Sequence, residues 1–276
     1  MEYRHRLVTD DLCEAFARDG VVRVPGAVDP VWFDGLLEYA ESELARPGPW
    51  ATDTNPGGTT ERLFTSRYNW PTDERLRRFV FESGVGELAA DLMGSRTARL
   101  YFEQLLVKEP RTTAPTPWHQ DLPYWPFLGE QIASVWVALT PATVSQSALE
   151  FVRGSHLGGG YYAPVSFTES SDWLADFVGE PCPDIEADRE AFDIVGWDME
   201  PGDALVFSAW TIHGAPGNEA DRRRVAIATR WLGDSAVWAP HPGSDPIITE
   251  EHMPVGPGEY PACDLLPLVV GGRPAD

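Results

Sequence analysis

The feature that most constrains the fold is a series of short apolar runs after residue 96, each closed by a turn containing proline or glycine. Runs of this length, rich in valine, leucine and aromatic residues, are typical of β-strands. Many short strands separated by such turns favour a sandwich or a barrel. The strands that we expect cover residues 98–107, 134–139, 148–152, 203–207 and 225–231.

The segment before residue 96 carries helix signals and one short strand. Asp29 followed by Pro30 is an N-cap with a first-turn proline, and Gly94 is a helix stop signal. A loop rich in proline, glycine and threonine follows the second helix. We therefore expect helices over residues 10–18, 30–46, 73–81 and 85–93, a strand over 21–24 and a loop over 47–60.

No internal repeat or low-complexity linker divides the chain, so we predict a single domain over residues 1–276. Its mostly helical part, 1–95, should pack on a β core over 96–235. Residues 158–193 form an acidic insertion that we expect to act as a lid. Its aromatic residues are Tyr161, Tyr162, Phe167, Trp173 and Phe177. A Pro/Gly-rich tail, 239–276, should wrap the surface.

Charge and composition exclude several classes of protein. The chain has 43 acidic against 21 basic residues and a net charge of −22, which does not suit a nucleic-acid partner or attachment to a membrane through basic residues. No run of 18 apolar residues is present, so a membrane protein is not expected. The three cysteines are far apart and the N-terminus shows no signal peptide, which favours a cytoplasmic location.

Two of the six histidines lie in a pattern that suits a metal ion. His119 and Asp121 form an H-x-D pair, and side chains two apart in an extended segment point to the same side. His213 follows 92 residues after Asp121, directly after an expected strand. Two histidines and one carboxylate form the facial triad of non-haem Fe(II) oxygenases. H-x-D alone is a weak signal, and a hydrogen-bonded loop histidine is the alternative.

Three consecutive arginines, 222–224, lead into the apolar strand expected at 225–231. The plain interpretation is a solvated charge cluster at a turn. An arginine that enters a buried strand, however, needs an anion, and its guanidinium matches a carboxylate with two hydrogen bonds. A dicarboxylate co-substrate would supply that anion.

Motifs along nearly the whole chain resemble, in order, those of the phytanoyl-CoA dioxygenase family, which are Fe(II)- and 2-oxoglutarate-dependent oxygenases. The segment TPWHQDLPYWP at 116–126 is similar to the family's iron-binding segment. The other similar segments are DGVVRVPG (19–26), LMGSRTARLYFEQLLVKEP (92–110), SVWVALTPAT (134–143), SALEFVRGSH (147–156), MEPGDALVFSAWTIHGAPGN (199–218) and RRVAIATRW (223–231).

The resemblance implies a mainly β fold with some α: a double-stranded β-helix, which is a cupin-like jelly roll, with the N-terminal helices packed on it. It implies that His119, Asp121 and His213 are iron ligands. It also implies that Arg224 holds the distal carboxylate of 2-oxoglutarate, because the family's arginine lies eleven residues after the distal histidine and is followed within two residues by an alanine, here Ala226.

Further residues follow from the same resemblance. Gln104 and Lys108 lie in the lead-in to the iron motif, where family members often place polar residues near the co-substrate. A strand-edge amide and a surface lysine are the alternatives. Two departures from the family pattern are Ala215, where Ser or Thr is frequent, and Ser147, where Gly is common. The aromatic residues expected to form a substrate wall are Tyr124, Trp125 and Trp210.

The function that the resemblance implies is hydroxylation of an unactivated C–H bond of a small metabolite, with Fe(II) as the cofactor. 2-Oxoglutarate and O2 are consumed, and succinate and CO2 are released. The alternative is a non-catalytic or non-redox cupin-type binding protein or isomerase, because a fold alone does not define a function. The net charge of −22 disfavours a polyanion such as an acyl-CoA and favours a neutral or cationic substrate. Neither the substrate nor the oligomeric state follows from the sequence.

Overall fold

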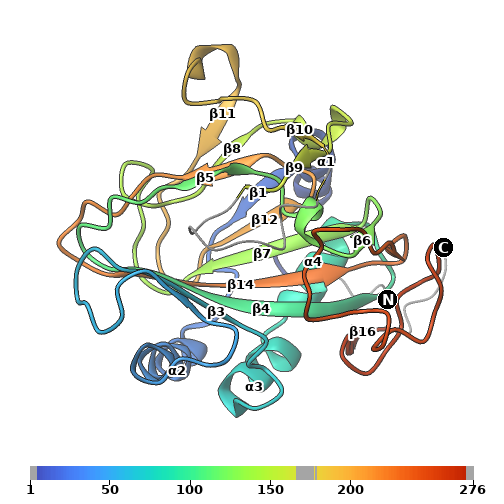
Figure 1. Ribbon diagram of the computed structural model, residues 1–276, viewed down its shortest axis with the longest axis horizontal. Coiled ribbons are helices and arrows are strands. Elements are labelled where there is room, and N and C mark those ends of the chain that lie inside the picture. Colours follow the sequence, from blue (N-terminus) through green and yellow to red (C-terminus); the bar gives the residue numbers. More distant parts are fainter. Residues whose placement is uncertain (1–4, 166–176, 178, 272–276) are drawn as a thin grey trace.

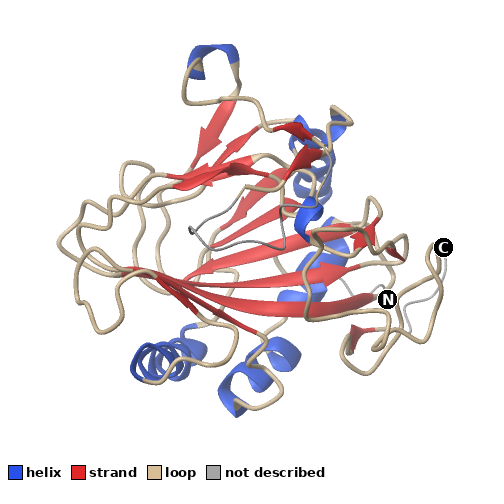
Figure 2. Cartoon of the chain, viewed as in Figure 1, coloured by secondary structure: helices blue, strands red, loops and turns tan. Residues whose placement is uncertain are grey.

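The computed structural model describes residues 5–165, 177 and 179–271. Two β-sheets pack face to face, and helices cover the outer face of the larger one, as Figures 1 and 2 show. The expected class, a mainly β jelly roll with helices packed on it, is confirmed. No helix in the described part of the chain is both long and apolar enough to span a membrane.

The larger sheet has the strand order β1-β12-β7-β14-β4-β3-β2, and β16 pairs with β4 beyond this path. Its central pairs, β12 with β7 and β7 with β14, are antiparallel. The strands are β1 (Val21–Val24), β2 (Thr52–Asp53), β3 (Leu63–Arg67), β4 (Ala98–Lys108), β7 (Ile132–Ala138), β12 (Ala204–Ser208), β14 (Arg224–Leu232) and β16 (Leu268–Val270).

The smaller sheet has the order β11-β8-β13-β5 and lies over the inner face of the larger one (Figure 1). Its strands are β5 (Thr116–His119), β8 (Glu150–Val152), β11 (Ile194–Gly196) and β13 (His213–Ala215). Two short pairs stand apart, namely β6 (Phe127–Leu128) with β15 (Val237–Trp238) and β9 (Tyr162–Ala163) with β10 (Glu180–Pro181).

The helices begin and end close to the positions that their caps predict. The Thr9 and Asp73 side chains accept hydrogen bonds from first-turn N–H groups of α1 and α3, and Gly20 closes α1 in the left-handed conformation. The helices are α1 (Asp10–Asp19), α2 (Phe33–Ala45, preceded by a 3₁₀ turn, Pro30–Trp32), α3 (Glu74–Glu82) and α4 (Val85–Leu92).

The alternation of β14 separates two cores. Val225 and Ile227 pack toward the helices, while Ala226 and Ala228 face the space between the two sheets. The helix-side core is filled with large aliphatic and aromatic residues. The inner face of β14 carries small residues instead, and larger side chains such as Trp136 and Phe151 pack in the same cluster.

Two parts of the chain depart from the sequence expectation. The first 95 residues contain β2 and β3 besides β1, because β3 pairs with β4 and so extends the larger sheet. The tail does more than wrap the surface, since Ile248, Met253 and Leu266 are buried and β16 joins the sheet. Of the expected lid, Phe167 and Trp173 lie outside the described residues.

Candidate metal centre

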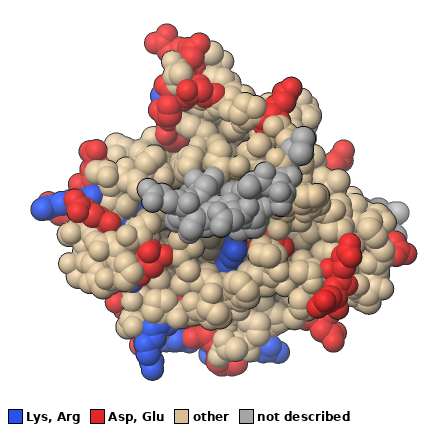
Figure 3. Space-filling view, viewed as in Figure 1, with Lys and Arg blue, Asp and Glu red and all other residues tan. Residues whose placement is uncertain are grey.

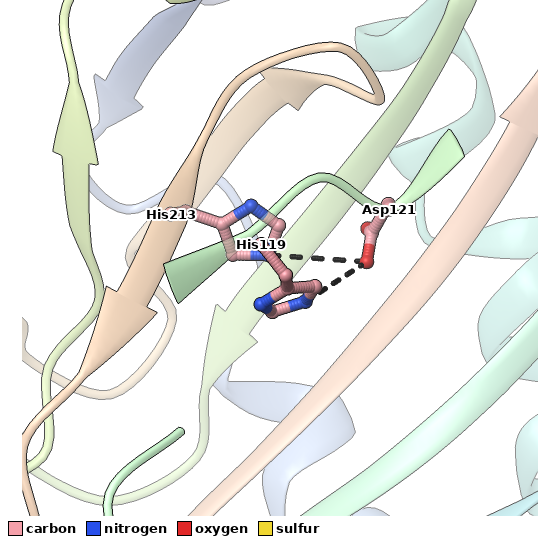
Figure 4. A group of neighbouring side chains, drawn as sticks. All are labelled: His119, Asp121 and His213. Atoms are coloured by element: carbon pink, nitrogen blue, oxygen red, sulfur yellow. Dashed lines mark ion pairs between the residues drawn. The ribbon is translucent and has the colours of Figure 1, made fainter. Parts of the chain in front are cut away.

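His119 and His213 lie on neighbouring strands of the smaller sheet. His119 ends β5 and His213 begins β13, and they are register partners in this antiparallel pair. Their ring centroids lie 4.2 Å apart. In Figure 4 both rings and the carboxyl group of Asp121 point toward one another. Strand pairing therefore brings together the two histidines that the sequence keeps far apart.

Backbone carbonyl groups fix which nitrogen of each histidine is free to bind a metal. His119 Nδ1 lies 2.8 Å from the Pro117 oxygen and His213 Nδ1 lies 3.0 Å from the Thr211 oxygen. A carbonyl oxygen only accepts, so each Nδ1 donates and each Nε2 keeps its lone pair. The Nε2 atoms lie 3.6 and 3.8 Å from Oδ1 of Asp121. The three ligand atoms lie within 4.8 Å of one another.

Asp121 lies beyond the end of β5, where the chain turns into a 3₁₀ helix (Leu122–Tyr124). The expectation of a fully extended H-x-D segment is wrong at Asp121, because this residue has helical backbone angles. Ser134 Oγ donates to Asp121 Oδ2 at 2.8 Å, and Arg230 Nε lies 3.6 Å from the same oxygen. Burial alone would raise the pKa of Asp121, but Arg230 and the two histidines hold it below its usual value.

The three residues fit a divalent iron ion. Two imidazole nitrogens and one carboxylate oxygen, with further positions open, are the donor set of non-haem Fe(II) sites. Burial, and then His119, lower the pKa of His213 to about 3, so this ligand is neutral near pH 7. The ring of Phe151 stacks on His213 at 5.7 Å and fixes its orientation. Within the described residues, no other group of three His, Cys, Asp or Glu side chains converges in this way.

Of the three consecutive arginines, Arg224 is the one buried in the interior. Its Nη1 donates to the Leu106 carbonyl at 2.9 Å and its Nε to Ser147 Oγ at 3.2 Å. The guanidinium carbon lies 5.8 Å from the ring centroid of Trp136. Burial lowers the pKa of Arg224 to about 10, so the guanidinium remains charged at neutral pH. Arg222, by contrast, is exposed.

The neighbour Arg223 points away from the interior and pairs with acidic side chains. Its Nη2 lies 2.8 Å from Glu109 Oε1, and Nη1 pairs with Glu41. Between Arg224 and the metal ligands, the interior side of β14 carries only Ala226 and Ala228. These small side chains pack in the interior cluster that also contains Trp136 and Phe151.

The backbone conformation of Ser147 accounts for the glycine that is common at this position in the family pattern. Its φ is +72°, in the left-handed region where glycine is relaxed and a side chain is strained. The frequent glycine of relatives therefore reflects a backbone requirement. In this chain the serine tolerates that conformation and its hydroxyl accepts the Arg224 hydrogen bond. The hydroxyl thus helps to orient the guanidinium.

Lys108 and Gln104 both face the jelly-roll interior. The alternative of a surface lysine is wrong, because Lys108 is fully buried and its Nζ donates to the Pro216 carbonyl at 2.8 Å. Burial, and then the charge of Arg224, lower the pKa of Lys108 to about 6. Gln104 Oε1 accepts a hydrogen bond from Arg230 Nη2 at 3.1 Å, which places the amide beside the metal ligands and away from Arg224.

The three predicted wall residues belong to one aromatic cluster beside the ligands. Tyr124 and Trp125 are buried in it, and Trp210 packs against it. The Tyr124 ring meets the ring of His119 edge to face at 5.7 Å. The Tyr124 hydroxyl donates to the Val165 carbonyl at 2.7 Å and accepts from the Val165 N–H at 2.8 Å. These two hydrogen bonds therefore hold the start of the insertion (158–193) against the aromatic cluster.

Sequence reasoning missed Ser134 and Arg230, which both contact Asp121. A signal for Arg230 was present, because it lies an even number of residues after Arg224 on the same strand and so shares its face. Ser134 gave no such signal, since its contact depends on how β7 lies beside the end of β5.

A jelly roll with two histidines and a carboxylate converging inside it defines a mononuclear non-haem metal enzyme. The sequence matches the phytanoyl-CoA dioxygenase (PhyH) family over residues 16–226, and the chain belongs to this family.

Among curated relatives, a probable phytanoyl-CoA dioxygenase of Caenorhabditis elegans is 27% identical over 180 residues, which are 63% of this chain. That match spans 56% of the relative's own length. The methylphosphonate hydroxylase of Gimesia maris is 25% identical over 223 residues, covering 79% of this chain and 78% of the relative.

Solved structures resemble the chain over almost its full length. The epimerase SnoN, in complex with Fe3+, alpha ketoglutarate and nogalamycin RO, has a TM-score of 0.71 and 26% identity, covering 94% of this chain and 98% of SnoN. The carbocyclase SnoK has a TM-score of 0.73 and 21% identity, covering 97% and 99%. These relatives share a fold while carrying out different reactions.

Proposed function

We propose that this protein is an Fe(II)- and 2-oxoglutarate-dependent dioxygenase that hydroxylates an unactivated C–H bond of a small metabolite. The observation that carries the proposal is the convergence of His119, Asp121 and His213, both histidines having Nδ1 tied to a carbonyl, in an interior that also buries Arg224. A metal ligand set, together with a buried guanidinium that has no carboxylate partner among the described residues, suits a dicarboxylate that chelates the metal.

In this proposal each group has a distinct task. The two histidines and Asp121 hold the iron, and Arg224 holds the distal carboxylate of 2-oxoglutarate. Ser147 orients Arg224, and Ser134 holds Oδ2 of Asp121 so that Oδ1 faces the metal. Iron with 2-oxoglutarate and O2 supplies an oxidant able to attack a C–H bond, and succinate and CO2 are released.

The aromatic wall excludes water and presents the substrate. Tyr124 lies against His119, and its hydroxyl group is hydrogen-bonded to the backbone of Val165. The ring therefore presents an apolar face next to the metal ligands. Trp125 extends this face. A closed apolar wall protects a reactive site from solvent and orients one C–H bond. The partner is thus a small molecule. None of the three cysteines, all in the described part of the chain, forms a disulfide, which supports a cytoplasmic location.

The alternative of a cupin-type binding protein or non-redox isomerase is less well supported, because it gives no use to Arg224 beside an intact ligand set. SnoN is an epimerase and SnoK is a carbocyclase. The kind of product that the substrate gives must therefore be tested separately from the use of 2-oxoglutarate. Hydroxylation inserts oxygen from O2, whereas epimerisation and ring closure do not.

The test is succinate formation from 2-oxoglutarate with Fe(II) and O2 across a panel of metabolites. We expect slow metal-dependent turnover alone and marked stimulation by the substrate. Under ¹⁸O2 the product should carry one labelled oxygen. If a compound stimulates succinate formation but its product carries no label at the oxidised carbon, the reaction is not a hydroxylation. No metal-dependent succinate with any compound would reject the oxygenase itself.

The pKa of Lys108 leads to a prediction about pH. In the co-substrate-free protein this pKa is about 6, so the amine is neutral at pH 7.5. A carboxylate bound beside Arg224 favours the charged ammonium and raises the pKa, so binding takes up a proton. We therefore expect 2-oxoglutarate to bind more weakly as the pH rises from about 7 to 9.

Calorimetric titration of 2-oxoglutarate in two buffers of different ionisation enthalpy measures this proton uptake. The matched control is Lys108→Met, which keeps the length of the side chain without a titrating group. Proton uptake should be present in the original protein and lost in the variant. Equal uptake in both proteins would show that another group titrates.

A further inference from the structure

A second arginine, Arg230, is buried in the same interior and has no task in the reaction described above. It lies six residues after Arg224 on β14 and is only 6% exposed. Its register partner on β7 is Ser134, the residue that donates to Asp121. Arg230 therefore lies at the level of the metal ligands, at the opposite end of the strand from Arg224.

The contacts of Arg230 leave much of its guanidinium unused. Nη2 donates to Gln104 Oε1 at 3.1 Å, and the guanidinium carbon lies 5.3 Å from the ring centroid of Phe102. Nε and Nη1 are buried and find no hydrogen-bond acceptor among the residues that the structure describes. The Gln104 amide N–H2 group adds two more donors to the same corner. Nε and Nη1 therefore face the interior as donors without an acceptor, beside the one shared carboxylate of Asp121, and such donors suit an anion.

The charges nearby do not supply a dedicated anion for Arg230. The nearest carboxylate, Asp121, lies 3.6 Å away, but its Oδ1 faces the two histidines and its Oδ2 accepts from Ser134. A metal ion at Oδ1 draws on the same negative charge. The other nearby acid, Asp245, is paired with Arg67 at 3.3 Å. Asp121 is therefore an ion-pair partner that Arg230 shares with the two histidines and Ser134, and an arriving anion would complete the neutralisation of the buried guanidinium.

The backbones of Arg224 and Arg230 lie far apart on β14, so we assign the distal carboxylate of the co-substrate to Arg224 alone. Six residues of strand separate Arg224 from Arg230, about 20 Å at the usual rise per residue. Between them β14 presents only the methyl groups of Ala226 and Ala228 to the interior. A dicarboxylate held at Arg224 would reach the metal with its other end, and Nε and Nη1 of Arg230, which have no acceptor among the described residues, are available to a second carboxylate.

We propose that Arg230 and Gln104 bind the carboxylate of the primary substrate, which is a small carboxylic acid with an apolar body. The apolar body follows from the surroundings, because Phe102 touches both Arg230 and the wall residue Trp125, at 6.0 Å between the ring centroids. The carboxylate anchors one end, and the aromatic wall holds the remainder beside the metal ligands. This assignment rests on the proposed oxygenase function and specifies its substrate class.

A carboxylic acid departs from the neutral or cationic substrate that the net charge favours, because the buried donors of Arg230 act on the substrate more directly than the distant surface charge. Figure 3 shows acidic side chains spread around this face and a basic side chain visible near its centre. The net charge of −22 repels a polyanion over long distances, whereas one carboxylate is repelled much less. Inside the protein, the low dielectric strengthens its attraction to a buried guanidinium.

The test uses the full chain loaded anaerobically with Fe(II) and 2-oxoglutarate. Calorimetry or thermal shift is used to screen a panel of small apolar-bodied carboxylic acids, each paired with its primary carboxamide. We expect at least one acid to bind about tenfold or more tightly than its amide, because a charge-assisted pair in a dry site is lost in the amide. If no acid surpasses its amide, the proposal is wrong.

Two variants locate the site. Arg230→Gln should weaken binding of the acid by about 30-fold or more. Gln104→Glu keeps the side-chain shape and gives Arg230 an internal carboxylate, so it should fold normally and also lose the acid. The matched control, Arg99→Gln, removes a partly buried guanidinium of β4 that packs on Tyr260, outside the interior. It should leave binding of the acid unchanged.

Binding of Fe(II) and of 2-oxoglutarate is measured for the same proteins in the absence of the acid. If Arg230→Gln weakens 2-oxoglutarate as strongly as Arg224→Ala does, the carboxylate belongs to the co-substrate and the proposal is overturned. If it chiefly weakens Fe(II), Arg230 positions Asp121 and the proposal is likewise overturned. Failure of the original protein to bind Fe(II) and 2-oxoglutarate at all would instead reject the oxygenase function.

Discussion

Replacement of His119 by alanine is expected to weaken Fe(II) binding by more than a hundredfold and to abolish turnover. His119 supplies one of three ligand atoms, and two ligands without the third no longer define a facial site. Loss of an outer partner of a ligand alone typically lowers metal affinity about 10- to 100-fold, so loss of the ligand itself should exceed that range. The measurement is metal content after equilibrium dialysis, together with succinate formation.

The matched control for this change is His156→Ala, which removes another partly buried histidine. The ring of His156 contacts the Ala17 carbonyl at 3.1 Å and lies outside the ligand group. We expect this variant to bind Fe(II) as the original protein does, even if it unfolds at a lower temperature. Equal metal content in His119→Ala and the original protein would show that the ion binds elsewhere.

The ligand set could be predicted from the sequence because metal chemistry restricts the residue types. His119, Asp121 and His213 were found from type, spacing and family resemblance, and they converge in the structure. Arg224 could be selected because the resemblance places the co-substrate arginine eleven residues after the distal histidine. These inferences use local rules that hold whatever the surrounding fold.

Other features depend on contacts that the sequence does not display. The segment that contains β2 and β3 is rich in proline and glycine next to a loop, and only pairing with β4 makes it part of the sheet. The same pairing covers β4, so Lys108 is buried between β3 and β14, although lysine is usually a surface residue. The partnership of Arg230 with Gln104 likewise requires two strands to be adjacent.

Replacement of Arg224 by alanine should leave Fe(II) binding intact and weaken 2-oxoglutarate binding by a factor of at least about 30, corresponding to the ~2–5 kcal/mol lost when one partner of a desolvated charge pair is removed. The apo protein should tolerate this change, because its buried guanidinium has only neutral partners, the Leu106 carbonyl and the Ser147 hydroxyl. Anaerobic titration of the Fe(II)-loaded protein with 2-oxoglutarate, followed by calorimetry or by the charge-transfer absorption of the complex, measures the effect.

Arg222→Ala and Arg223→Ala are the controls, because they change the neighbouring arginines without reaching the interior. Arg222 is exposed, so its loss should alter 2-oxoglutarate binding less than about twofold, as expected for a surface charge. Arg223 pairs with Glu109 and Glu41, so its loss should lower stability and leave 2-oxoglutarate binding unchanged. If either of these variants, rather than Arg224→Ala, lost the co-substrate, then the carboxylate would approach from the outer side of β14.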